Sequence, residues 1–319
     1  MELPRRNFLT SLGGLVAASA LPSFAADDPK IFPARGRFER LELSYQHIHL
    51  GLKEPFSILH ISDTHLTACD AREPDKADFA AKRQQTFGGC QEESLRDSLA
   101  WAKNNVDYVV HTGDLIEFQT EANYDLVRKY FGETAGTMFG APGNHEYQRR
   151  IKEEGIRNTD EYNALSRATL NKVFPYDVTF QSTVVKGVNF ICLEQVYGFV
   201  LPSQVARFKD EVKKGLPIIL CMHVPFFSDH IWRSSMKFWR NAGRKFRMTE
   251  VPAAVGDYKR QLEDPVTRDF LAYLKQEPLL RGILCGHLHI DVQDRFSPTA
   301  MQYVVGGNFI PHGEEILFT

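Results

Sequence analysis

The stretch FSILHISDTHL, residues 56 to 66, places a short apolar run directly before Asp63 and His65. An apolar run of this length is typical of a buried β-strand. Because strand side chains alternate between the two faces of a sheet, residues two apart point to the same side. The sequence therefore predicts that Asp63 and His65 lie together at the end of a strand, where they could share one metal ion.

Four further apolar runs end in polar clusters of the same kind. The clusters lie in HTGDLIE (111–117), APGNHEY (141–147), CMHVP (221–225) and CGHLH (285–289). They supply the side chains of Asp114, Asn144, His145, His223, His287 and His289. A lone histidine or a Gly-Asp pair is ordinary core or turn chemistry, but five such endings in this order are hard to obtain by chance.

Another pair of histidines in the same chain serves as an internal comparison. His47 and His49 are also separated by one residue, but neither an apolar strand nor a glycine precedes them. We interpret this pair as a solvated strand face and not as a metal site.

The spacing of apolar residues predicts a mixed α/β fold. Short apolar runs alternate with longer amphipathic ones, which is typical of packed layers of strands and helices and not of a helical bundle. Strands are expected at 56–62, 107–113, 136–143, 177–183, 188–194, 217–223, 282–287 and 301–307, and helices near 90–104, 120–131, 203–214 and 266–276. Two segments, 66–88 and 226–262, interrupt the alternation. We interpret them as insertions or loops at strand ends, where the ligand-facing loops of α/β folds collect.

The five motifs resemble those of the calcineurin-like metallophosphoesterase superfamily, in the order found in that family. The resemblance implies one domain over residues 26–319, folded as a four-layer α/β/β/α sandwich, with two metal ions at the carboxyl ends of the strands. It implies that one ion is held by Asp63, His65, Asp114 and His289, and the other by Asp114, Asn144, His223 and His287, with Asp114 bridging. His145, in the Gly-Asn-His motif, would protonate the leaving-group oxygen or stabilise the transition state.

The types of side chain in these clusters support a metal site independently. Mixed imidazole, carboxylate and amide ligands suit Mn, Fe or Zn better than Ca, which prefers all-oxygen ligands. Two ions about 3.5 to 4 Å apart can clamp both oxygens of an in-line displacement at phosphorus. A hydroxide that bridges the two metals would then be the nucleophile, so no serine or cysteine nucleophile is needed.

Glu117 departs from the family pattern, because many members carry Asp or Tyr at this position. The missing tyrosine argues against the purple acid phosphatase subgroup, in which that residue ligates iron. Glu117 either orients His145 with a longer side chain or caps a helix. Glu146 does not belong to a His-Glu-x-x-His zinc motif, because Arg149 stands four residues after His145.

The segment 230–248 is rich in basic and aromatic residues and contains no acidic residue. It begins shortly after His223, so Arg233, Trp239 and Arg240 could belong to a rim that binds phosphate oxygens and stacks on a base or a lipid headgroup. The alternative is a solvated helix whose aromatic side chains pack on the domain.

Residues 1–25 have the order of an export signal. Arg5 and Arg6 precede an apolar segment that is shorter than the roughly 20 residues of a membrane span and that ends in small residues. RRNFL resembles a twin-arginine signal, so we expect cleavage after Ala25, a periplasmic or other extracytoplasmic location, and no transmembrane span in the mature chain. In an oxidising compartment, Cys69 and Cys90 could form a disulfide.

The composition is ordinary for a soluble globular protein, with 43% apolar and 24% charged residues in a chain of 319. A formal net charge of -2 gives no reason to expect a nucleic-acid partner. The leading hypothesis is a metal-dependent hydrolase that acts on a small-molecule or lipid phosphate mono- or diester. The alternative is a non-catalytic protein that binds metal or phosphoesters on the same fold. The complete order of motifs argues against a hydrolase of another bond, such as a peptide.

Overall fold

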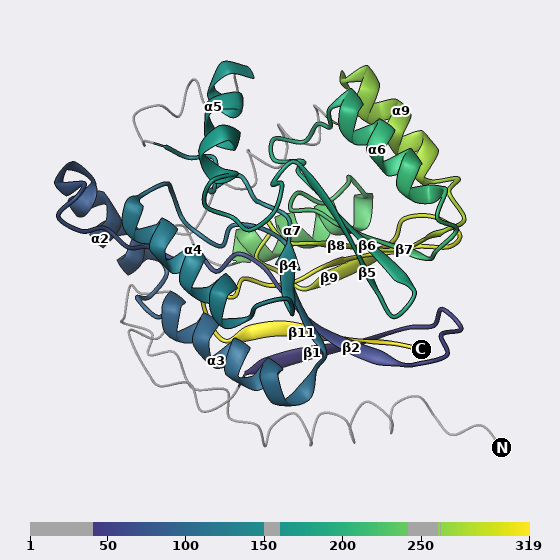
Figure 1. Ribbon diagram of the computed structural model, residues 1–319, viewed down its shortest axis with the longest axis horizontal. Coiled ribbons are helices and arrows are strands. Elements are labelled where there is room, and N and C mark those ends of the chain that lie inside the picture. Colours follow the sequence, from purple (N-terminus) through teal and green to yellow (C-terminus); the bar gives the residue numbers. More distant parts are fainter. Residues whose placement is uncertain (1–40, 150–159, 242–260, 262) are drawn as a thin grey trace.

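Two mixed β-sheets form the centre of the computed structural model, which describes residues 41–149, 160–241, 261 and 263–319 (Figure 1). The first sheet has the order β1-β11-β2-β3-β4 and the second the order β5-β6-β7-β8-β10-β9. The strands of the first sheet are β1 (Glu42–Ile48), β2 (Phe56–Ile61), β3 (Tyr108–His111), β4 (Met138–Gly140) and β11 (His312–Phe318). Those of the second are β5 (Phe180–Val185), β6 (Val188–Leu193), β7 (Ile218–Cys221), β8 (Leu280–Cys285), β9 (Val292–Arg295) and β10 (Met301–Val304).

Successive residues of the central strands belong to different hydrophobic cores. In β2, Ile58 packs in the core between the two sheets, whereas Leu59 packs on the opposite face of the first sheet. In β7, Ile219 belongs to the core between the sheets and Leu220 to the core on the outer face of the second sheet. Because both faces of these strands are buried, β7 is a continuous apolar run, and β2 is interrupted only by Ser57 and by His60, whose ring contacts Thr112 and Glu314.

Helices cover the outer face of each sheet. On the first sheet, α3 (Gln91–Asn105) and α4 (Glu121–Glu133) pack through residues such as Leu95 and Val127. On the second sheet, α6 (Pro202–Val212) and α9 (Pro265–Leu274) pack through Phe208 and Phe270, whose rings contact each other edge to face. The order helix, sheet, sheet, helix confirms the predicted four-layer α/β/β/α sandwich (Figure 1).

Several predicted strands end earlier in the structure than in the sequence-based prediction. The segments predicted at 107–113, 136–143, 217–223 and 282–287 leave the sheet after His111, Gly140, Cys221 and Cys285. The strand predicted at 177–183 instead begins at Phe180, because Asp177 forms a turn in which its carboxylate accepts from the backbone N–H of Thr179. The residues that follow the shortened strands are therefore free to form loops.

Three strands and one helix outside the interrupting segments differ from the prediction or add to it. Strands β9 and β11 were not predicted, and β1 was expected only as the strand face that carries His47 and His49. Both of these histidines are exposed and contact the hydroxyl of Thr319, at 2.7 and 3.1 Å. The helix α5 (Asp160–Leu170) was not predicted either.

The two interrupting segments contain helices as well as loops. Residues 66–88 include the short 3-10 helix η1 (Pro74–Lys76) and α2 (Ala77–Thr86), and residues 226–262 include α7 (Asp229–Asn241). The remainder of the second segment, residues 242–260 and 262, lies outside the described residues, as does the predicted export signal at 1–25.

The disulfide that the sequence left open between Cys69 and Cys90 is not formed. Cys69 is a free thiol, and its Sγ donates to the carbonyl oxygen of Glu73 at 3.1 Å. Among the residues that the structure describes, no helix combines the length and the apolar character needed to cross a bilayer.

Candidate metal centre

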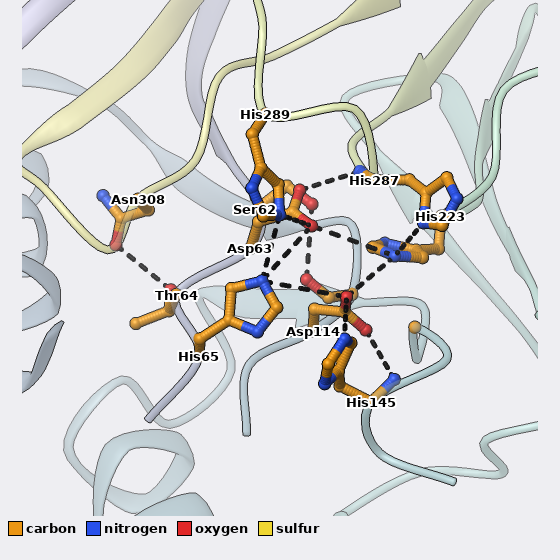
Figure 2. Close-up of polar contacts among 12 residues, drawn as sticks. Ser62, Asp63, Thr64, His65, Asp114, His145, His223, His287, His289 and Asn308 are labelled. Atoms are coloured by element: carbon orange, nitrogen blue, oxygen red, sulfur yellow. Dashed lines mark hydrogen bonds and ion pairs between the residues drawn. The ribbon is translucent and has the colours of Figure 1, made fainter. Parts of the chain in front are cut away.

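Seven of the predicted site residues converge where the carboxyl ends of strands from the two sheets meet (Figure 2). They lie in the loops that follow β2, β3 and β4 of the first sheet and β7 and β8 of the second. Within each sheet these strands run parallel to their neighbours in the group, so their carboxyl ends meet at the same edge. The seven residues are Asp63, His65, Asp114, His145, His223, His287 and His289, and the eighth predicted residue, Asn144, directly precedes His145 in the loop after β4.

The backbone at five of these residues has a left-handed conformation. The φ angles of Asp63, His65, Asp114, His287 and His289 are 55°, 53°, 54°, 71° and 54°. Residues other than glycine rarely adopt such angles, because each costs roughly 1–3 kcal/mol and persists only where the surrounding structure enforces it. Here the loops hold one another, since the N–H of Asp63 donates to Gly113 and that of His65 to the carbonyl of Asp114, both at 2.8 Å.

Asp63 and His65 do not lie together for the predicted reason, which was the alternation of side chains along a strand. The strand β2 ends at Ile61, so neither residue belongs to an extended segment with alternating side chains. The two side chains nevertheless approach each other, with His65 Nε2 3.8 Å from Asp63 Oδ1. The left-handed conformations of both residues, and not strand alternation, bring their side chains together.

Glycines allow the loops to approach this closely. Gly113 has a φ of +103°, and a Cβ at this position would lie 2.6 Å from the backbone nitrogen of Gly143 and 2.7 Å from His223 Nδ1. A Cβ on Gly286 would overlap the side chains of Ser62 and Asp63. The glycine that precedes the aspartate or histidine in these two motifs is therefore required by packing.

One group of side chains that could hold a metal ion consists of Asp63, His65 and His289. His289 Nε2 lies 3.2 Å from Asp63 Oδ1 and 3.1 Å from His65 Nε2. Ligand atoms that each lie about 2.1 Å from one ion are roughly 3.0–3.4 Å apart, so both of these distances are those expected around a shared ion. Asp63 Oδ1 is fully buried and has no hydrogen-bond donor among the described residues, which leaves its lone pairs directed at this group.

A second group consists of Asp114, His223 and His287. His223 Nε2 lies 3.1 Å from Asp114 Oδ2 and 3.2 Å from His287 Nδ1. The other nitrogen of His223 faces the carbonyl oxygen of Thr112 at 2.8 Å, which fixes a proton on Nδ1 and makes Nε2 the nitrogen that could bind an ion. Near these residues, the buried Oδ1 of Asn144 has no hydrogen-bond partner among the described residues.

The two carboxylates lie between the two groups. Asp114 Oδ2 is 3.9 Å from His65 Nε2, and Asp63 Oδ1 is 3.9 Å from His223 Nε2, so each carboxylate reaches toward the other group as well as its own. Burial opposes ionisation, but the surrounding imidazoles outweigh it and lower the pKa of Asp63 and of Asp114 well below the usual range. Both carboxylates are thus ionised, as carboxylate ligands of a metal ion must be.

His145 is the most open of the histidines whose side chains line the site. Its side chain is 15% exposed, compared with 1% for His65 and 0% for His223. Its Nε2 lies 4.0 Å from Asp114 Oδ2. Burial lowers the pKa of His145, but the carboxylates of Glu117 and Asp114 raise it more, to about 9. The imidazole can therefore carry a proton at neutral pH.

Glu117 contacts two site histidines and does not cap a helix. The helix α4 begins at Glu121, and its cap is Thr120, whose hydroxyl accepts from the N–H of Asn123. The Glu117 carboxylate instead lies 2.6 Å from His65 Nδ1 and 3.1 Å from His145 Nδ1. Of the two interpretations from the sequence, the orienting one fits this geometry, and it extends to His65.

Sequence reasoning missed the role of Glu146. Its carboxylate accepts from the backbone N–H groups of Asp114 at 2.9 Å, Ile116 at 3.1 Å and Gly143 at 2.7 Å. It therefore ties the loop after β3 to the loop after β4. The available signal was an acidic residue directly after Gly-Asn-His, but Glu146 was weighed only as part of a zinc motif. Arg83 and Phe87, in the 66–88 insertion, also contact the site and carry no recognisable motif.

The residues predicted for a substrate rim have different surroundings. The Arg233 side chain is 79% exposed and pairs with Asp229 at 3.5 Å, one turn earlier in α7. Trp239 is 6% exposed, and its Nε1 donates to the carbonyl of Leu288 at 3.2 Å, between the two histidines of that turn. The side chain of Arg240 lies outside the described residues. The position of Trp239 corresponds to the alternative in which the aromatic side chains pack on the domain.

Residues 56–291 match the family described as calcineurin-like phosphoesterase, which covers all five motifs. No curated protein matches the chain. Among solved structures, the chain is similar to a dimetal phosphatase from Danio rerio, with 12% identity, a TM-score of 0.39, and coverage of 81% of this chain and 90% of that one.

Two further solved structures are similar at the same low level of identity. A purple acid phosphatase from yellow lupin (Lupinus luteus) seeds has 13% identity and a TM-score of 0.46, with 81% of this chain and 45% of that chain covered. A phosphopantetheinyl hydrolase from Mycobacterium tuberculosis has 13% identity and a TM-score of 0.40, with 79% and 90% covered. The chain thus spans less than half of the lupin protein and most of the mycobacterial one.

Proposed function

The chain belongs to the calcineurin-like phosphoesterase family, a family of metal-dependent phosphoester hydrolases, and on that premise we propose that it hydrolyses phosphate mono- or diesters with two divalent ions. The observation that carries the proposal is the pair of ligand groups, Asp63, His65 and His289 beside Asp114, His223 and His287. In each group, one ligand atom from every residue lies within 4.8 Å of the others. Two neighbouring groups of this kind suit the in-line displacement at phosphorus that two metal ions promote.

The proposed ligands divide between the ions as the distances suggest. Asp63, His65 and His289 would hold one ion, and His223 and His287 the other, with Asp114 between them. Asn144 is added to the second set because of its place in the family motif and its buried Oδ1, which has no hydrogen-bond partner among the described residues. Their imidazole, carboxylate and amide groups favour Mn, Fe or Zn over Ca. When bound, such ions supply positive charge to the phosphoryl oxygens and a water that is activated at neutral pH.

The contribution of the protein itself is to place a proton donor. Hydrolysis joins the water oxygen to phosphorus, releases one water proton to solvent and breaks the bond between phosphorus and the leaving-group oxygen. His145, which borders Asp114 and is held by Glu117, would protonate that oxygen as the bond breaks. Since it is partly exposed, His145 can recover its proton from solvent.

The test is turnover of p-nitrophenyl phosphate and bis-p-nitrophenyl phosphate by the protein loaded with Mn²⁺, Fe²⁺ or Zn²⁺. We expect hydrolysis that disappears on chelation and returns with metal, together with two bound ions per chain by elemental analysis. The Asp114→Asn variant, purified in parallel, controls for contaminating phosphatases. Binding of metal and phosphoester without turnover would instead favour the non-catalytic alternative. A subsequent panel of nucleotides, sugar phosphates and phospholipid vesicles would separate small-molecule from lipid substrates.

We also propose export, on the strength of the sequence alone. Arg5 and Arg6 precede a short apolar segment, in the order of a twin-arginine signal. Fractionation of cells that express the full chain should place a shortened protein outside the cytoplasm. The paired substitution Arg5→Lys and Arg6→Lys should retain the full-length chain inside, and unchanged export would contradict the signal assignment.

A further inference from the structure

Arg83 and Phe87 bring the helix α2 into contact with the candidate metal centre. Arg83 lies in the last turn of α2, and its Nε donates to Glu117 Oε1 at 2.5 Å. The Arg83 guanidinium also lies 5.1 Å from the centre of the Phe87 ring. Phe87, which follows the helix, stacks on the imidazole of His65, with ring centres 4.3 Å apart and planes 10° from parallel. The contacts close into a ring that runs Arg83–Glu117–His65–Phe87.

The contact between Arg83 and Glu117 fixes the direction of the carboxylate. The Glu117 side chain is 1% exposed, and a buried carboxylate needs a compensating partner. Arg83 supplies a permanent positive charge at Oε1. Because Oε1 is held there, Oε2 remains directed at His65 Nδ1, at 2.6 Å, and at His145 Nδ1, at 3.1 Å.

The contact between Phe87 and His65 fixes the plane of the imidazole. Phe87 is 2% exposed, and its ring covers one face of His65 while a second aromatic ring, Phe309, packs 5.1 Å from it. With Nδ1 held by Glu117 and one face covered, His65 Nε2 points into the ligand group, 3.1 Å from His289 Nε2 and 3.8 Å from Asp63 Oδ1. Partners of this kind set the ring orientation and tautomer of metal-binding histidines.

We infer that Arg83 and Phe87 are positioning residues, through which the 66–88 insertion holds His65 ready for metal binding and, by way of Glu117, His145 ready for proton transfer. The inference rests on the proposed function for the second of these roles. The first role concerns metal affinity and is open to measurement without any turnover. The insertion thereby acquires a role in the geometry of the centre rather than in the choice of substrate.

The experiment compares Arg83→Gln, Arg83→Lys and Phe87→Leu with the wild-type protein. Affinity for Mn²⁺ is measured by competition with a chromophoric chelator, and kcat and KM are measured with p-nitrophenyl phosphate. Removal of a supporting partner of a metal ligand typically costs about 10- to 100-fold. We expect Arg83→Gln and Phe87→Leu to weaken the binding of one ion about tenfold and to lower kcat by a similar factor, with KM nearly unchanged.

Two variants distinguish positioning from general destabilisation. Arg83→Lys keeps the charge but not the guanidinium geometry, so it should recover part of the loss. Arg72→Gln is the matched control, because Arg72 lies in the same insertion and pairs with Asp70 and Asp125 on the surface, away from the site. Its metal affinity and kcat should stay within about twofold of the wild type.

The outcomes separate this inference from the proposed function. Unchanged metal affinity and kcat in folded Arg83→Gln and Phe87→Leu would overturn the inference, whether or not thermal stability falls. Losses of the same size in Arg72→Gln would overturn it as well. If the wild type binds metal but turns over no phosphoester, the proposed function fails, while a tenfold weaker metal affinity in Arg83→Gln would still support the positioning of His65.

Discussion

His287 Nδ1 lies 3.2 Å from His223 Nε2. His289, two residues further along the same turn, instead directs its Nε2 to Asp63 Oδ1 at 3.2 Å. Both histidines have left-handed backbone angles, and the N–H of His287 donates to Asp63 Oδ2 at 2.8 Å. One short turn after β8 therefore presents its two imidazoles to two different groups of ligands (Figure 2).

This division predicts that His287→Ala and His289→Ala weaken different ions. Loss of a direct ligand should cost more than the roughly 10- to 100-fold that supporting partners contribute. Calorimetric titration of the metal-free protein should resolve two binding events in the wild type, with a different one weakened in each variant. His49→Ala, on the exposed end of the first sheet, serves as the control. Loss of the same single ion in both variants would refute the division.

Replacement of His145 should slow turnover without removing metal. A positioned general acid typically contributes about 10²- to 10⁴-fold, so His145→Asn should lower kcat within that range. The loss should be largest for alkyl phosphates, whose leaving oxygen needs a proton, and smallest for p-nitrophenyl phosphate. Elemental analysis should find the metal content of the wild type. An equal loss for both leaving groups would argue against proton donation by His145.

Glu117 should set the alkaline limit of activity. Its carboxylate helps to raise the pKa of His145 to about 9, against the effect of burial, and only the protonated imidazole can donate to the leaving group. Turnover should therefore fall as the pH rises through this pKa. In Glu117→Gln the pKa of His145 loses that support, so the fall should occur at lower pH.

The measurement for Glu117→Gln is the pH dependence of kcat/KM, which reports the pKa values of the free enzyme. Each point needs saturating metal, because Glu117 also contacts His65 and its loss should weaken metal binding. Thermal unfolding over the same pH range controls for loss of the fold. An unchanged alkaline limb would show that another group limits activity there.

The layers of the fold could be predicted because burial leaves a local signature in the sequence. Strands such as β6 and β7 are buried on both faces, so they appear as apolar runs, which Asn189 alone interrupts in β6. Strand β11 lies between β1 and β2 in the first sheet, yet it contains Glu314, which is buried and contacts His60 Nδ1 at 3.3 Å. A glutamate in a sequence predicts a solvent-exposed position. Glu314 can be buried only because His60, which is distant in the sequence, contacts its carboxylate.

The composition of the candidate site could be predicted, but its geometry could not. Polar residues after parallel strands must meet at one edge, and this places Asp63 and Asp114 near each other whatever the loop conformation. Their left-handed angles depend on hydrogen bonds between different loops, which no local pattern encodes. The contact from Arg83 to Glu117 spans 34 residues and joins a helix to a loop. Nothing in the sequence around Arg83 distinguishes it from a surface arginine.

The surroundings of Trp239 and Arg233 predict that substitution of the first weakens metal binding, whereas substitution of the second has almost no effect. Trp239→Phe keeps most of the buried ring but removes the hydrogen bond to Leu288, so the turn that carries His287 and His289 should loosen. A lost hydrogen bond of this kind costs about 1 kcal/mol, which corresponds to roughly fivefold weaker metal binding if it falls on the bound state. Arg233→Ala removes an exposed side chain and should leave KM and metal affinity within about twofold of the wild type. Chelator competition and steady-state kinetics on both variants decide the matter, and a several-fold rise of KM in Arg233→Ala would restore the interpretation of α7 as a substrate rim.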